Sequence, residues 1–457
     1  MRRAFTLLVA VAALGAACGS APVAVTTSTT AVSATTITTT TLPPRPETAR
    51  AAGLPWWNDR VFYEMFVRSF ADSDGDGIGD LQGAIDRLDY LNDGNPATHD
   101  DLGVTGIWLM PVFESPSYHG YDVTDYRTVE SDYGTNEDLK AFVAAAHRRG
   151  MVVILDLVIN HTSVEHPWFT ASASGEADYA DWYVWSDDDP GFSGPDGQQV
   201  WYRQGGRFYY ALFWEGMPDL DLENPSVTAE ITDIARFWIE ETGVDGYRID
   251  AARHLVEDGA IQVDTAATLA WLERFQLALP ADTLVLGEVW APAEIVARYL
   301  PEALDLAFEF DLAATTTQGV AGADAGAVAD SLERVAGLYP NGQHAVFLSN
   351  HDQQRVMSQF GISPAKARMA ATLLLTYPGV PFVYYGEEVG MSGRKPDPRL
   401  RTPMPWTGEA PGLGFTTGEP WEEPQSGSAT ANVEDQSGDP DSLLSLYRDL
   451  IELRRDH

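Results

Sequence analysis

The stretch 246–254 ends a short β-rich run with a group of charged side chains. Residues 244–249 read as a mainly apolar strand, and Arg248, Asp250, Arg253 and His254 lie at or just beyond its end. An ionised carboxylate out of water needs a partner, and Arg248 precedes Asp250 by two residues, on the same face of a strand. This pattern indicates either a structural ion pair or a functional carboxylate that the arginine holds ionised.

Three further β-rich runs also end in polar side chains. The four ends carry Asp156, Asn160 and His161, then Arg248 and Asp250, then Glu288, and then Asn350, His351 and Asp352. The carboxyl ends of barrel strands meet at one mouth, so we expect Asp250, Glu288 and Asp352 to converge there. Packing explains one charged strand end, but four at one rim indicate a catalytic site.

The elements that position these residues alternate along the chain. Helical spacing over 136–149, 227–241, 366–376 and 443–453 marks segments that lie between strands. The pattern predicts a (β/α)8 TIM barrel, and the alternative is an open doubly wound sheet, which lacks its usual Gly-rich turn after the first strand. The expected strands are 61–67, 104–112, 151–158, 244–249, 284–289, 304–310, 344–348 and 380–385.

One connection is too long for a barrel loop. Residues 161–225 are rich in Trp, Tyr, Asp and Gly and contain no clear strand–helix unit, so we expect an inserted subdomain there. The insertion divides the barrel into a first part, 53–160, and a second part, 226–457.

The four strand ends resemble the four signature regions of the α-amylase family, glycoside hydrolase family 13. The segments are Asp-Leu-Val-Ile-Asn-His (156–161), Gly-Tyr-Arg-Ile-Asp-Ala-Ala-Arg-His (246–254), Gly-Glu-Val-Trp (287–290) and Phe-Leu-Ser-Asn-His-Asp (347–352). Met-Pro-Asp-Leu-Asp (217–221) is similar to a fifth, shorter motif of the family. Their order and spacing also match, from about residue 54 to the end.

The resemblance implies a role for each matching residue. Asp250 would be the nucleophile, Glu288 the general acid/base, and Asp352 would orient substrate hydroxyls. Retaining hydrolysis needs one ionised and one protonated carboxyl group about 5–5.5 Å apart. Arg248 would keep Asp250 ionised, and burial with neighbouring carboxylates would raise the pKa of Glu288. The implied substrate contacts include Arg248. The others are His161 and His351 as hydrogen-bond donors, Tyr121 stacked on the sugar ring, and His119 or Asp122 on hydroxyls.

The segment 72–80 places carboxylates at alternate positions with glycines between them. Such a loop can wrap a hard cation with oxygen ligands, here from Asp72, Asp74, Asp76, Asp80 and the carbonyl of Ile78. It begins like an EF-hand, but Gly83 stands where the closing glutamate would be. It resembles the calcium (Ca2+) loop of the family's oligo-glucosidase branches, and the alternative is a solvated acidic turn. The resemblance leaves open whether a second calcium ion binds at Asn160.

The N-terminal residues are typical of an exported protein. Residues 1–18 combine Arg2 and Arg3 with an apolar run and small residues, which predicts a signal peptide. The single cysteine, Cys18, stands where a bacterial lipoprotein would be lipidated, and the alternative is ordinary secretion with an incidental cysteine. Residues 19–52 are Ser-, Thr- and Pro-rich and predict a disordered tether. We therefore expect an extracellular protein, secreted or attached to a membrane through lipidated Cys18.

Charge limits the partners. The formal net charge is -38 at pH 7, with 29 basic and 67 acidic residues, which argues against nucleic acid and anionic membranes. We expect a monomer that binds α-glucans such as starch and maltodextrins.

The resemblance favours an endo-acting α-amylase that cleaves α-1,4 bonds, because Ala251-Ala252 after the nucleophile resembles α-1,4-acting members. The segment 385–391 resembles the oligo-glucosidases more closely, so an exo-acting α-glucosidase or a transglycosylase is the alternative. A non-catalytic glucan-binding protein is a remote one, since all three carboxylates are present. The family's C-terminal β-sandwich is expected to be missing, because the sequence reaches His457 directly after the last helix.

Overall fold

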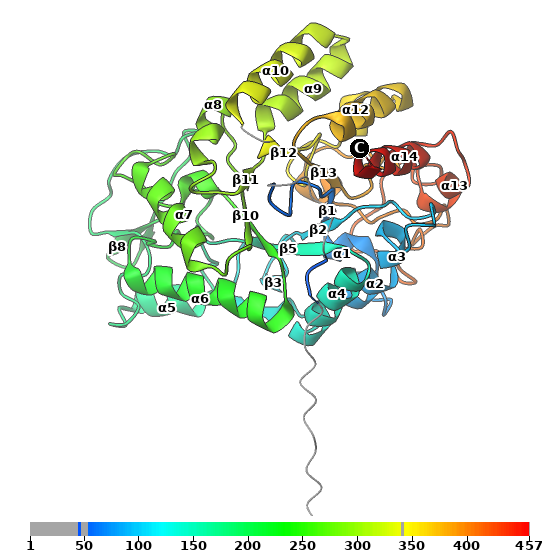
Figure 1. Ribbon diagram of the computed structural model, residues 1–457. Coiled ribbons are helices and arrows are strands. Elements are labelled where there is room, and N and C mark those ends of the chain that lie inside the picture. The colour runs from blue at the N-terminus through cyan, green and yellow to red at the C-terminus, as the bar shows by residue number, and fades with distance from the viewer. Residues whose placement is uncertain (1–43, 47–53, 340–341, 457) are drawn as a thin grey trace, which may run out of the picture. The chain divides into compact units, whose positions relative to one another are not determined.

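The computed structural model describes residues 44–46, 54–339 and 342–456 (Figure 1). The predicted signal peptide, Cys18 and the predicted tether, except residues 44–46, lie outside the described residues. None of the helices in the described part of the chain is long and apolar enough to cross a membrane.

Eight parallel strands form the centre of the fold, and each of the eight expected runs contains one of them. Their order in the sheet is β11-β10-β9-β5-β2-β1-β13-β12, and a parallel bridge between Phe308 and Ala345 joins the two ends. The strands therefore follow one another around a closed barrel, which confirms the (β/α)8 prediction and excludes the open sheet. The strands are β1 (Phe62–Met65), β2 (Gly106–Leu109), β5 (Val152–Leu157), β9 (Gly246–Ile249), β10 (Leu284–Gly287), β11 (Leu306–Ala307), β12 (Ala345–Val346) and β13 (Val380–Tyr384).

Helices form an outer layer around these strands (Figure 1). Two of the longer ones show how the sequence sets their ends. Thr135 and Asp138 form a capping box before α4, and Asn224 caps α6 with Pro225 in its first turn. The helices are α1 (Val67–Phe70), α2 (Leu81–Asp86), α3 (Leu88–Leu91), α4 (Asn136–Arg148), α6 (Pro225–Thr242), α7 (Ala266–Ala278), α8 (Ala293–Val296), α9 (Phe310–Gly322), α10 (Ala325–Leu338), α11 (Val356–Gln359), α12 (Pro364–Thr376), α13 (Val433–Ser437) and α14 (Leu443–Asp456).

The long connection after β5 has secondary structure of its own. It contains α5 (Pro167–Ser174) and an antiparallel sheet in the order β6-β8-β7, from β6 (Trp185–Ser186), β7 (Trp201–Gln204) and β8 (Arg207–Tyr210). A bridge between His161 and Asp219 ties the end of the connection to its start. A short hairpin of β3 (Phe113–Glu114) and β4 (Asp125–Val129) follows β2.

Apolar side chains fill the inside of the barrel. Phe62 stacks on Phe382 with the ring centroids 4.7 Å apart, and Trp108, Ile154 and Leu284 belong to the same buried cluster. The packing leaves no room at Gly106, where an added Cβ would lie 2.5 Å from the Phe62 ring. This rigid core holds the carboxyl ends of the strands in fixed positions.

Candidate active site

One buried arginine connects the ends of β5, β9 and β10. Parallel pairing places Asp156 of β5 opposite Arg248 of β9. Nη1 of Arg248 contacts Asp156 Oδ1 at 2.8 Å and Asp250 Oδ1 at 2.6 Å, while Nη2 contacts Glu288 Oε2 at 2.9 Å. Arg248 was predicted among the substrate contacts, but its side chain is 1% exposed and its ion pairs are with three carboxylates of the site. In this structure it positions the carboxylates.

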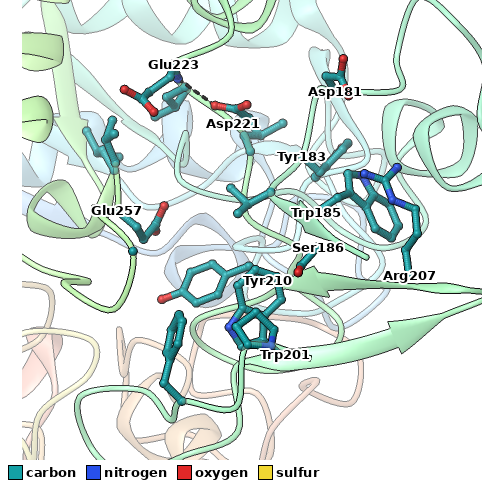
Figure 2. Close-up of a pocket in the computed structure, with 18 residues that line it drawn as sticks. Asp181, Tyr183, Trp185, Ser186, Trp201, Arg207, Tyr210, Asp221, Glu223 and Glu257 are labelled. Atoms are coloured by element: carbon teal, nitrogen blue, oxygen red, sulfur yellow. Dashed lines mark hydrogen bonds between the residues drawn. The ribbon is translucent and has the colours of Figure 1, made fainter. Parts of the chain in front are cut away.

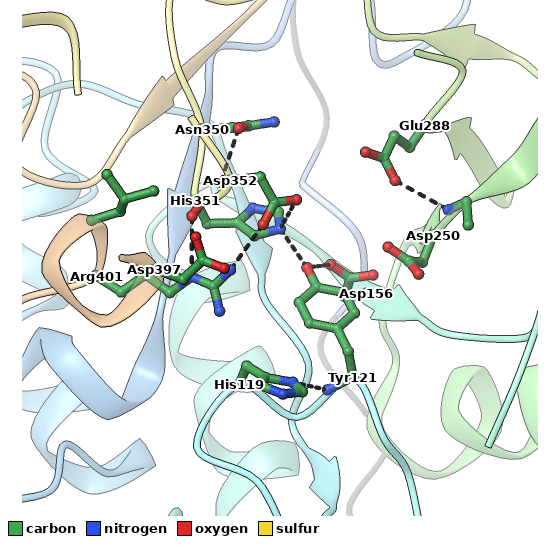
Figure 3. Close-up of polar contacts among 12 residues, drawn as sticks. His119, Tyr121, Asp156, Asp250, Glu288, Asn350, His351, Asp352, Asp397 and Arg401 are labelled. Atoms are coloured by element: carbon green, nitrogen blue, oxygen red, sulfur yellow. Dashed lines mark hydrogen bonds and ion pairs between the residues drawn. The ribbon is translucent and has the colours of Figure 1, made fainter. Parts of the chain in front are cut away.

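Asp250 and Glu288 share that guanidinium and keep one side open. Their side chains are 12% and 14% exposed, whereas Asp156 is fully buried. Figure 3 shows both carboxyl groups on the same side of the site, facing Asp352 and His351. The shared guanidinium keeps the two groups near each other, and retaining enzymes need two carboxyl groups about 5–5.5 Å apart.

The surroundings of Arg248 favour a proton bound to one of its three carboxyl partners. Burial raises the pKa of Glu288, and Asp250 and Asp352 raise it further against the opposing effect of Arg248. Burial also raises the pKa of Asp250, although Arg248 lowers it, and burial raises the pKa of Asp156 to about 7. We expected Arg248 to hold Asp250 ionised. The contact is present, but one cation serves three carboxyl groups, so the cluster as a whole tends to bind a proton.

The turn after Asp250 fixes the distance to Glu288. Ala251 adopts a left-handed conformation, with φ at 49°, which costs a residue with a side chain about 1–2 kcal/mol. Its backbone N–H donates to Glu288 Oε2 at 3.1 Å. Strain of this kind persists where the surroundings hold it and is frequent at functional sites.

Asp352 lies on the opposite side of the site in a separate ionic network (Figure 3). Its Oδ1 accepts from Arg401 at 2.8 Å, and its Oδ2 lies 3.2 Å from His351 Nε2. Burial opposes ionisation, but His351 and Arg401 hold the pKa of Asp352 well below its usual range. With its side chain 36% exposed, Asp352 is an ionised acceptor open to a ligand.

The loop between β3 and β4 carries Tyr121, His119 and Asp122. The Tyr121 hydroxyl lies 3.1 Å from Asp156 Oδ2 and 2.7 Å from His351 Nε2, which places its half-buried ring between the two halves of the site. His119 Nδ1 accepts from the Tyr121 N–H at 3.1 Å, so its other nitrogen is the one left to donate. Asp122 accepts hydrogen bonds from Ser115 and Ser117 and is buried, so it shapes this loop.

The two predicted histidine donors have partners within the protein. His161 Nε2 lies 3.0 Å from the Tyr121 carbonyl and Nδ1 lies 3.0 Å from Asn160 Oδ1, and burial lowers the pKa of His161 to about 4. His351 is fully buried, with Nδ1 2.6 Å from Glu64 Oε1. Their contact with sugar hydroxyls stays a prediction, because these nitrogens support Tyr121 and Asp352 in the structure.

Three carboxylates of the 72–80 loop approach one another as predicted for a cation site. One oxygen each from Asp72, Asp74 and Asp80 lie within 4.8 Å of one another, whereas Asp76 is not in this group and accepts from the Ile78 N–H at 2.8 Å. Gly77, with φ at 97°, lies against the Glu419 carbonyl, and the Trp421 N–H donates to the Gly77 carbonyl at 2.9 Å. The loop therefore wraps its carboxylates against the segment 415–421, an arrangement that fits a hard cation.

The second calcium stays a prediction. Asn160 Nδ2 donates to the His254 carbonyl at 2.8 Å. The neighbouring Asp219 is buried, and its Oδ2 has no hydrogen-bond partner among the described residues.

Comparison with known proteins identifies the family of this chain. Residues 64–457 match the family model "Alpha amylase, catalytic domain". The chain belongs to the α-amylase family. It is 41% identical over 411 residues to alpha-amylase 3 of Dictyoglomus thermophilum, which covers 88% of this chain and 78% of that protein. The α-amylase structure from H. orenii superimposes with a TM-score of 0.80 at 43% identity, covering 88% of this chain and 82% of that one.

Relatives with other activities match over a similar length. An oligo-1,6-glucosidase of Heyndrickxia coagulans is 31% identical, covering 88% of this chain and 85% of that protein. A 4-alpha-glucanotransferase of Thermotoga maritima is 34% identical, covering 84% of this chain and 85% of that protein. The chain is therefore a glycoside hydrolase of this family, and its relatives of similar coverage differ in activity.

Sequence reasoning did not find two members of the site, Glu64 and Arg401. Glu64 interrupts the apolar run of β1 on the same face as Phe62, so period-two alternation could have placed it inside the barrel. Arg401 lies in the long loop after β13, where no regular spacing of residues predicts which side chains face the site.

A cavity of about 510 Å³ lies apart from these carboxylates, between the insertion and residues 255–259 (Figure 2). It contains none of the predicted site residues. The Trp185 ring there stacks on Phe169 and also contacts the Arg207 guanidinium. Burial, with Asp221 and Glu223, raises the pKa of Glu257 there to about 7.

Proposed function

We propose that this member of the α-amylase family is a retaining hydrolase of α-1,4-glucosidic bonds in starch-like α-glucans, with endo-acting α-amylase activity. Glu288 donates its proton to the glycosidic oxygen while Asp250 attacks the anomeric carbon and forms a covalent glycosyl-enzyme. Glu288, now ionised, takes a proton from water, which attacks the same carbon and releases Asp250. Each of the two steps inverts the configuration at the anomeric carbon, so the product retains the configuration of the substrate.

One observation carries this proposal. Asp250 and Glu288 bind the same buried guanidinium at 2.6 and 2.9 Å and both keep part of their carboxyl surface open. The shared cation keeps them close, while burial and mutual repulsion let only one of them lose its proton easily. That difference is what a nucleophile and a general acid require of two similar groups.

Asp352 and Tyr121 bind and orient the sugar in this scheme. Asp352 is held ionised by His351 and Arg401, so it accepts hydrogen bonds from hydroxyl groups and stabilises the distorted ring. The Tyr121 ring provides an apolar face beside the nucleophile.

The endo-acting assignment is supported by the higher identity to α-amylases, 41% and 43%, than to the oligo-1,6-glucosidase at 31%. The alternatives within the family are exo-acting hydrolysis and glucan transfer. The test is the early product profile on soluble starch beside maltose. Mixed oligomers from starch with maltose untouched support an endo-acting enzyme, glucose from both shows exo-action, and products longer than the substrate show transfer.

We further propose that the protein acts as a monomer. We also propose that Asp72, Asp74 and Asp80 hold a calcium ion, which stabilises the contact of the 72–80 loop with residues 415–421. The three close carboxylates repel one another, and a divalent cation would remove that cost.

We also propose export, with attachment to the membrane through lipidated Cys18. Mass spectrometry of the protein from membrane fractions of its host should find a fatty-acylated N-terminal Cys18. A soluble product without Cys18 would point to simple secretion.

A further inference from the structure

Glu64 is a carboxylate inside the barrel, and it contacts His351, which can carry a positive charge. Its strand, β1, directs Phe62 and Glu64 to the interior, and Glu64 is 2% exposed. Its Oε1 lies 2.6 Å from His351 Nδ1 and accepts from the His351 backbone N–H at 3.3 Å. A buried carboxylate at this position needs such a donor.

The other nitrogen of His351 faces the reacting side of the site. Nε2 lies 2.7 Å from the Tyr121 hydroxyl and 3.2 Å from Asp352 Oδ2. If His351 carries both protons, Nε2–H donates to these oxygens, and the Tyr121 hydroxyl is free to donate to Asp156 at 3.1 Å. If Nε2 loses its proton, its lone pair faces an ionised Asp352. The Tyr121 hydroxyl then has to donate its one proton to Nε2 and can no longer donate it to Asp156.

We propose that Glu64 is a positioning residue: its charge keeps His351 as an imidazolium, which holds the Asp352 ion pair and the direction of the Tyr121 hydroxyl bond. The geometry supports this, because His351 stands between two carboxylates on opposite ring nitrogens. The pKa of His351 agrees: burial lowers it, but Asp352 and Glu64 raise it to about 9.

The groups that face His351 come from several elements. Glu64 lies on β1, Asp156 on β5, and Asp250 follows β9; all three are acidic and favour the imidazolium. Arg401 opposes them, but its Nε donates to the His351 carbonyl at 3.1 Å and its Nη2 pairs with Asp352. The Trp108 ring of β2 packs against the imidazole at a centroid distance of 5.7 Å.

The test is the protonation state of His351 in full-length protein labelled with ¹⁵N-histidine. Its two ring-nitrogen shifts are followed from pH 5.5 to 10 in wild type, Glu64→Gln, Glu64→Asp and Glu309→Gln, and assigned by their loss in His351→Gln. Glu64→Gln keeps the size and an acceptor oxygen but removes the charge. Glu309→Gln neutralises another buried carboxyl group, which contacts Tyr339 and not His351.

We expect both nitrogens of wild-type His351 to stay protonated up to about pH 9. Glu64→Gln should lower the pKa of His351 by about 1–3, Glu64→Asp should restore part of it, and Glu309→Gln should leave it unchanged. A neutral His351 at pH 7 in wild type, or the same titration midpoint in Glu64→Gln, would overturn the proposal.

The consequence for turnover rests on the proposed function, whereas the titration does not. The loss of kcat/KM on maltoheptaose in Glu64→Gln should increase with pH, by up to about tenfold per pH unit above the lowered pKa of His351. A purely structural defect would give the same loss at every pH, and that result would refute the positioning role. If no glucan is cleaved, the proposed function fails while the titration still decides the role of Glu64.

Discussion

Replacing Arg248 by methionine should destabilise the protein in a way that depends on pH. The substitution removes the cation that contacts Asp156, Asp250 and Glu288 at 2.6–2.9 Å. A charge left buried without its partner typically costs about 3–5 kcal/mol. The three carboxyl groups will escape part of this cost by binding protons, so their pKa values in the folded variant should rise above those of the unfolded chain.

The sign of the pH dependence follows from those raised pKa values. Below the unfolded pKa of about 4, the groups are protonated in both states and the variant has little deficit. As pH rises from the unfolded pKa towards the raised folded pKa values, the unfolded state releases protons that the folded state retains, so stability is lost, and the loss levels off above the folded values. In wild type the pKa of Asp156 is already raised to about 7, and losing Arg248 raises it further, so the deficit relative to wild type should be larger at pH 8 than at pH 5.

The assay is urea unfolding of wild type and Arg248→Met at pH 5 and pH 8, monitored by tryptophan fluorescence. Arg149→Met is the control, because its partner Asp89 is 70% exposed and such surface pairs contribute about 0–1 kcal/mol. Equal deficits at the two pH values, or a deficit at pH 8 no larger than that of the control, would show that Arg248 does not compensate buried charge.

Three further predictions concern catalysis and calcium. Asp250→Asn should lower kcat by about 10³–10⁶-fold on soluble starch while leaving the melting temperature and glucan binding nearly unchanged; near-normal turnover would exclude Asp250 as the nucleophile. Because Glu288 must be protonated and its pKa is raised, kcat/KM should fall as a single ionisation on the alkaline side, above the usual pKa of glutamic acid, about 4.3; a fall that begins at that ordinary value would contradict the burial argument. Chelation should remove about 2.7 kcal/mol of stability if calcium was present at 100 times its Kd, and in Asp72→Asn the chelator should have much less effect; a wild-type melting temperature that does not change would leave only a solvated acidic turn.

The strands were predictable because most of their residues are apolar on both faces. Parallel barrel strands are covered by helices outside and by packed side chains inside, so runs such as 151–158 stand out from their surroundings. Strand ends such as Asp250 and Glu288 were predictable for the same reason, since a charge directly after a buried run marks the mouth.

Contacts across the site were not predictable from the run of residues. That Arg248 would serve Glu288 as well as Asp250 depends on the pairing of β9 with β10, which sequence spacing does not record. The partners of His161 and His351 follow from the position of the Tyr121 loop, which is set by the β3–β4 hairpin. The choice of Asp72, Asp74 and Asp80, without Asp76, depends on how the glycines of that loop turn.

The most direct test of the account is the anomeric form of the first product. ¹H NMR of maltoheptaose hydrolysis should be recorded before mutarotation equilibrates the new reducing ends. If Asp250 is the nucleophile and Glu288 the acid/base on one guanidinium, the α-anomer must appear first. Initial β-anomer would mean direct attack by water, and Asp250 could not then form a glycosyl-enzyme.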